Sequence, residues 1–107
     1  DLILGDNVKL EIGSASGGDL QLYHDGSNSY VTDQGTGNLR LGGTTVEILT
    51  SAHNETMATF ATNGAVTLYY DNDAKLNTKT DGVVISGNLD VDVVESSSQR
   101  GFAWKCD

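Results

Sequence analysis

Residues 20–33 read LQLYHDGSNSYVTD and contain the pattern on which the rest of the chain is built. Apolar and polar residues alternate through LQLY (20–23), a polar cluster HDGSN (24–28) follows, and the alternation resumes in SYVTD (29–33). Such alternation is typical of a half-buried β-strand, and Gly, Asn and Asp favour tight turns. The stretch therefore predicts a hairpin whose corner starts at Asp25, with the Asp25 side chain bonding backbone amides two residues further on.

Short runs of the same kind recur along the chain, separated by turns rich in Gly, Asn and Asp. They lie at residues 8–12, 20–23, 38–41, 46–48, 65–69, 83–85 and 89–93. Residues 51–61 fit either a helical turn or a strand, and Thr56, Thr59 and Phe60 favour the strand. No window keeps a helical apolar spacing and proline is absent. Strands spaced about ten residues apart with such turns predict an all-β chain.

The supply of apolar side chains is small for a chain of 107 residues. Only 37% of the residues are hydrophobic, 7% are aromatic and 13 are glycine. A lone domain of this size buries about two-thirds of the surface that its unfolded chain exposes. We therefore expect the chain to bury apolar surface against other chains rather than in a core of its own.

Charge excludes several classes of partner. The formal charge is −9 and the six basic residues are scattered singly, whereas nucleic-acid binding needs Lys and Arg to neutralise phosphates. An anionic membrane surface is disfavoured for the same reason, and no run of about 18 apolar residues could cross a membrane. The lone Cys106 cannot form an internal disulfide. We expect no nucleic-acid partner, no membrane insertion and no cofactor.

Two motifs each occur twice. LYHDG at 22–26 returns as LYYDN at 68–72, and GNLRL at 37–41 returns as GNLDV at 87–91. We therefore divide the sequence into a leading β segment at residues 1–17, two repeats at 18–50 and 51–93, and a C-terminal tail or connector to further sequence at 94–107. Repeated units that cannot bury their own faces generally stack on neighbours.

The motifs resemble a known family. The run GDLQLYHDGSNSYV (18–31), followed by Asp33 and by GTGNL (35–39), resembles a repeat in tail-fibre and virion structural proteins of tailed phages, of the cyanophage and marine-phage type. TLYYDN (67–72), AKL (74–76), TDGV (80–83) and SGNL (86–89) are similar to a companion repeat of the same proteins. The resemblance covers most of residues 18–93.

This resemblance implies an elongated, repetitive β-structure, β-helix-like or β-prism-like, in an intertwined homotrimer. Three chains would share one hydrophobic axis, and other virion tail proteins would be further partners. The candidates for the axis are Leu20, Leu22, Leu39, Leu41, Ile48, Leu68, Ile85, Leu89 and Val91. The polar residues between them are expected to face water: Gln21, Arg40, Glu47, Thr67 and Asp90. The expected function is a structural shaft that supports host attachment, located in the virion and outside the cell.

The pair His24-Asp25 could represent a base and its orienting carboxylate. Adjacent residues of a strand point to opposite faces, however, and the nearby serines are turn residues. We therefore interpret the pair as a hairpin corner and expect no enzymatic activity. A His24 that faced a trimer axis would meet two copies of itself and could hold a metal ion.

Aromatic residues leave an alternative open. Five of them could stack on the sugar rings of a host polysaccharide, namely Tyr23, Tyr30, Tyr69, Tyr70 and Trp104. Packing of hairpins or of the seams between chains is the simpler interpretation. A carbohydrate-binding module of the fibre, a fragment of a polysaccharide depolymerase and a non-viral extracellular filament are the alternative functions.

Overall fold

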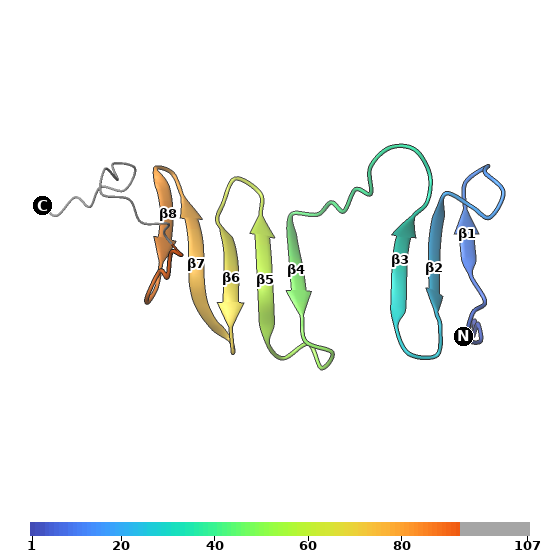
Figure 1. The fold of residues 1–107 in the computed structure, drawn as a ribbon, viewed down its shortest axis with the longest axis horizontal. Coiled ribbons are helices and arrows are strands. Elements are labelled where there is room, and N and C mark those ends of the chain that lie inside the picture. Colours follow the sequence, from blue (N-terminus) through green and yellow to red (C-terminus); the bar gives the residue numbers. More distant parts are fainter. Residues whose placement is uncertain (93–107) are drawn as a thin grey trace, which may run out of the picture. The chain divides into compact units, whose positions relative to one another are not determined.

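The computed structural model describes residues 1–92, and this part of the chain is all-β (Figure 1). Within residues 1–92, eight strands form two antiparallel sheets, one of three strands and one of five. The strands are β1 (Leu10–Ile12), β2 (Leu20–His24), β3 (Ser29–Asp33), β4 (Thr45–Leu49), β5 (Thr56–Ala61), β6 (Val66–Tyr70), β7 (Asp73–Lys79) and β8 (Gly82–Ile85). The all-β prediction is confirmed, as is the strand within residues 51–61. Residues 1–92 contain no helix that could cross a membrane.

The first compact unit, Asp1–Gly42, contains the three-stranded sheet in the order β1-β2-β3. The β2–β3 hairpin is the one predicted from residues 20–33, and Tyr23 lies opposite Tyr30 next to its corner. Asp25 forms this corner, because its Oδ1 accepts hydrogen bonds from the amides of Ser27 and Asn28 at 2.8 and 2.7 Å. The predicted role of Asp25 is thus confirmed.

The second compact unit, which begins at Gly43, contains a meander in the order β4-β5-β6-β7-β8. Its β6–β7 turn has two central residues, Asp71 and Asn72, with φ angles of 49° and 67°. A turn with positive φ at both positions matches the twist of the strands that it joins, and Asn and Asp tolerate that conformation well. The repeated LYHDG and LYYDN motifs therefore both end a strand at a hairpin corner.

Two predicted strands are wrong in the described part of the chain. Residues 38–41 and 89–92 belong to no strand, and Val93 lies outside the described residues. The alternating pattern reports which side chains prefer one face, but a strand also needs a partner for its backbone. β7 is a strand that the pattern did not predict, because its sequence DAKLNTK contains one large apolar residue and shows no clear alternation of apolar and polar residues.

In the described chain, burial is the reverse of the usual pattern, in which apolar side chains are buried and polar ones are exposed. No hydrophobic residue is buried there, whereas Gln21 and Thr67 are only 7% exposed. The prediction that Gln21 and Thr67 face water is therefore wrong. Both lie in inner strands, β2 and β6, each of which has a neighbouring strand on both sides.

Candidate assembly surface

One row of apolar side chains crosses every strand of the second sheet. Residues directly opposite each other in neighbouring antiparallel strands project from the same face. Following the register from β4 to β8 gives the row Ile48–Ala58–Leu68–Leu76–Ile85. All five side chains are apolar, so this row joins the whole width of the sheet.

A second row on the same face lies two residues away along each strand. It contains Val46–Phe60–Val66 on β4 to β6 and Thr78–Val83 on β7 and β8. The two rows together are called the apolar face of the second sheet. They contain no charged residue, although the chain carries a net charge of −9.

The opposite face of the second sheet is polar. Its central row is Glu47–Thr59–Thr67–Asn77–Val84. Asn77 donates a hydrogen bond from Nδ2 to Oγ1 of Thr67 at 3.1 Å. Hydrogen bonds between side chains within the chain thus satisfy polar groups on this face.

The first sheet has the same two-sided character. Its apolar face holds the rows Leu10–Leu22–Val31 and Ile12–Leu20–Asp33, and its polar face holds Glu11–Gln21–Thr32. The β1–β2 loop lies against the polar face, because Gln21 donates a hydrogen bond from Nε2 to the carbonyl of Gly17 at 2.5 Å. Gly18 is buried there with a φ of 74°, and a Cβ on it would come within 2.7 Å of the Glu11 Cβ. The loop therefore requires a glycine at this point.

The candidates for a shared axis fall into two groups. Five lie on the apolar faces, namely Leu20, Leu22, Ile48, Leu68 and Ile85. The other four lie outside the strands, namely Leu39, Leu41, Leu89 and Val91. Sequence reasoning missed other members of the apolar faces, such as Leu10, Phe60 and Leu76. The register between strands, which the sequence alone does not fix, places them there.

Two tyrosines of the first sheet form a closed stack. The rings of Tyr23 and Tyr30 lie 4.6 Å apart between centroids with an interplanar angle of 15°. Nζ of Lys9 lies 4.8 Å from the Tyr23 centroid. Each ring thus covers one face of the other, and packing of the hairpin occupies surfaces that a sugar ring would use.

The hydroxyl of Tyr30 completes the corner at Asp25. It donates a hydrogen bond to Asp25 Oδ2 at 2.7 Å. Hydrogen bonds from the Asn28 amide, the Tyr30 hydroxyl and the Ser27 amide lower the pKa of Asp25 to about 2. The same bond to Asp25 raises the pKa of Tyr30, because it is donated by the neutral phenol.

His24 lies apart from these bonds. Its Nδ1 is 3.0 Å from Oγ of Ser29, the residue opposite it in β3. Both carboxylate oxygens of Asp25 are engaged by the corner, so the base-and-orienter geometry is not formed. His24 projects from the apolar face, two residues from Leu22. A metal ion on a shared axis stays a prediction, and among the described residues no three His, Cys, Asp or Glu side chains gather as a metal site would require.

Two further aromatic candidates, Tyr69 and Tyr70, lie on β6 of the second sheet. Tyr69 lies opposite Ala74 and Tyr70 opposite Asp73. Tyr70 is 74% exposed. Trp104 lies outside the described residues.

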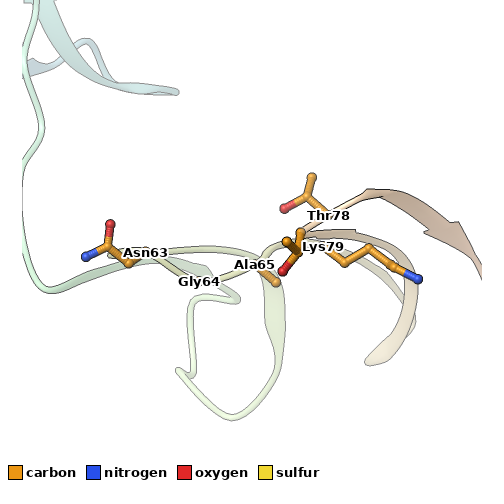
Figure 2. Close-up of a pocket in the computed structure, with 6 residues that line it drawn as sticks. Asn63, Gly64, Ala65, Thr78 and Lys79 are labelled. Atoms are coloured by element: carbon orange, nitrogen blue, oxygen red, sulfur yellow. The ribbon is translucent and has the colours of Figure 1, made fainter.

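The described residues of the second unit form a hollow at one end of the sheet and a groove along its edge. The first, of about 320 Å³, lies where the β5–β6 and β7–β8 turns meet, and Figure 2 shows Asn63, Thr78 and Lys79 around it. Lys79 pairs with Asp81 at 3.2 Å. The second hollow is a groove of about 580 Å³ along the edge strand β8, lined by Val83, Ile85, Gly87, Asn88 and Leu89. The groove adjoins the apolar face through Val83 and Ile85.

Comparison of this chain with protein-family models, curated proteins and solved structures found no match.

Proposed function

We propose that the chain is a self-associating structural segment of a tailed-phage fibre or a related virion appendage, where it helps to build a stiff β-rich shaft. The observation that carries the proposal is the uncovered apolar face of each sheet. The polar faces make hydrogen bonds within the chain, whereas among residues 1–92 no layer of the same unit covers the apolar rows. The repeated motifs described above supply the link to phage fibres.

Physical chemistry supports association through the apolar faces. Ordering the backbone costs about 1–2 kcal/mol per residue, and apolar burial is the main term that offsets this cost. A sheet with no buried hydrophobic side chain gains little of this favourable free energy of apolar burial by itself. Packing of the apolar faces of separate copies against each other supplies the missing burial. Sheets that pack face to face in this way lie about 10 Å apart.

Three copies around one axis are the arrangement that we propose. Each copy contributes apolar rows to the axis and keeps its acidic turns in water. The role is mechanical rather than enzymatic, and the place is the virion, outside the host cell. Presentation of a tip or an anchor for host attachment follows from a shaft that keeps its shape.

The test compares two neighbouring valines on β8. Val83 belongs to the apolar face and Val84 to the polar face. The mass of the wild type, Val83→Asp and Val84→Asp is measured by light scattering over a range of concentrations. The expected result is an oligomer, three copies in mass, for the wild type and Val84→Asp, and dissociation for Val83→Asp. A wild-type monomer, or dissociation by Val84→Asp alone, would overturn the proposal.

A further inference from the structure

The GNLRL and GNLDV motifs occupy equivalent places in the two units. The first follows β3, which ends at Asp33, and the second follows β8, which ends at Ile85. Each begins with a glycine of positive φ, 106° at Gly37 and 116° at Gly87. Within residues 1–92 neither segment belongs to a strand. The chain thus carries two segments with the pattern of a strand and no backbone partner among its described strands.

The two segments complement each other in charge. Arg40 stands in the middle of the first and Asp90 at the equivalent place in the second. On either side lie exposed apolar residues, Leu39 and Leu41 in the first segment and Leu89 and Val91 in the second.

We propose that residues 38–41 of one copy pair as a β-strand with residues 88–91 of a second copy, with Arg40 opposite Asp90. The inference rests on the self-association proposed above and names the segments that carry part of it. Successive side chains of a strand point to opposite faces. The register that places Arg40 opposite Asp90 therefore gathers the four apolar side chains on the other face, whether the strands run parallel or antiparallel.

The surroundings of the second segment suit an added strand. β8 is an edge strand of its sheet, and such edges readily accept a strand from another chain. Leu89 shares the groove with Val83 and Ile85. Apolar side chains brought by Leu39 and Leu41 would thus meet apolar surface that continues into the apolar face of the second sheet.

Connectivity favours a second copy over the same chain. β4 and β8 are the two edges of the five-stranded sheet and lie about 19 Å apart at the usual strand spacing, and Leu89 of the second segment lies beside β8. Leu41 is joined to Thr45, the first residue of β4, by a stretch that spans at most about 14 Å. The short connection therefore disfavours pairing of residues 38–41 with residues 88–91 of the same chain. A contact between unlike segments closes into a ring or continues as a filament.

The test reverses the two charges singly and together. Arg40→Asp makes the chain more acidic and Asp90→Arg makes it less acidic, so a shared loss of affinity cannot come from net charge. Sedimentation at low ionic strength should show the dissociation constant rising by roughly fivefold or more in each single variant, because like charges then face each other. The double variant should recover the wild-type value, and added salt should reduce the differences among the variants.

Two outcomes of the charge reversals would contradict the inference. Single reversals without effect would overturn it, as would a double variant at least as weak as the single ones. If Val83→Asp dissociates the oligomer while the charge reversals do nothing, this inference fails and the proposed function stands. A monomeric wild type would remove both.

Discussion

Replacing Leu68 by aspartate tests the apolar face of the second sheet at its centre. Leu68 lies on β6, the middle strand of that sheet, and 43% of its surface is exposed. Full burial of a leucine side chain contributes about 1.5–3 kcal/mol, so covering the exposed fraction contributes about 0.6–1.3 kcal/mol per chain. This is the free energy that Leu68→Ala can remove from assembly, which corresponds to at most about a tenfold change in the dissociation constant.

Leu68→Asp removes the same contribution and adds a carboxylate to a surface that excludes water. An unpaired buried charge costs on the order of 3 kcal/mol or more. The sum, about 4 kcal/mol per chain, predicts a dissociation constant about a thousandfold higher. Sedimentation velocity across a dilution series measures the dissociation constants of the wild type, Leu68→Ala and Leu68→Asp.

Val84→Asp is the matched control. Val84 is 42% exposed, nearly the same as Leu68, but projects from the polar face. A surface substitution there should change stability by no more than about 0.5 kcal/mol. If Leu68→Asp and Val84→Asp weaken assembly equally, the assignment of the interface to one face is wrong. An unchanged oligomer in Leu68→Asp would refute the reasoning altogether.

Three further predictions concern the hairpin corner and the coupling of folding to assembly. Leu22→Asp should prevent assembly by placing a charge on the apolar face of the first sheet, whereas His24→Ala should leave the oligomeric mass unchanged in light scattering. The pKa of Asp25 lies below its ordinary value, so the contribution of Asp25 to stability is complete above about pH 4 and is lost as the pH falls toward 2. Circular dichroism across this pH range should show a loss of stability in the wild type. The variant Asp25→Asn, which lacks this titration, should show a much smaller loss. The thermal midpoint should rise with protein concentration, because burial of the apolar faces requires other copies, and a midpoint independent of concentration would argue for a self-sufficient monomer.

Local chemistry made the hairpins predictable. The corner at Asp25 follows from a side chain that can bond amides two and three residues ahead, and the Asp71-Asn72 turn follows from residues that tolerate positive φ. The alternation of apolar and polar residues in the flanking runs predicted β2, β3 and β6, and this alternation is also a local property of the sequence. These features depend on a few consecutive residues, and the sequence displays them directly.

Properties that depend on partners were not predictable. The sequence cannot show that residues 38–41 pair with none of the described strands, because pairing is decided by distant segments. It also cannot show that Gln21 lies under the β1–β2 loop, since the covering carbonyl of Gly17 arrives through a turn at Gly17 and Gly18. β7 was missed because its neighbours, rather than its own apolar content, hold it in the sheet.

The contact between Gln21 and the β1–β2 loop lies within one chain, whereas the apolar faces contact other copies. Substitutions at these two kinds of position should therefore differ in how their effects depend on protein concentration. A substitution at Gln21 harms the single polypeptide, and its effect should therefore be the same at every dilution. A substitution on the apolar face of either sheet should not change stability in a dilute sample, but should lower stability as the protein concentration rises and copies associate. Genetic screens run at low and at high expression would accordingly select different residues of the same chain.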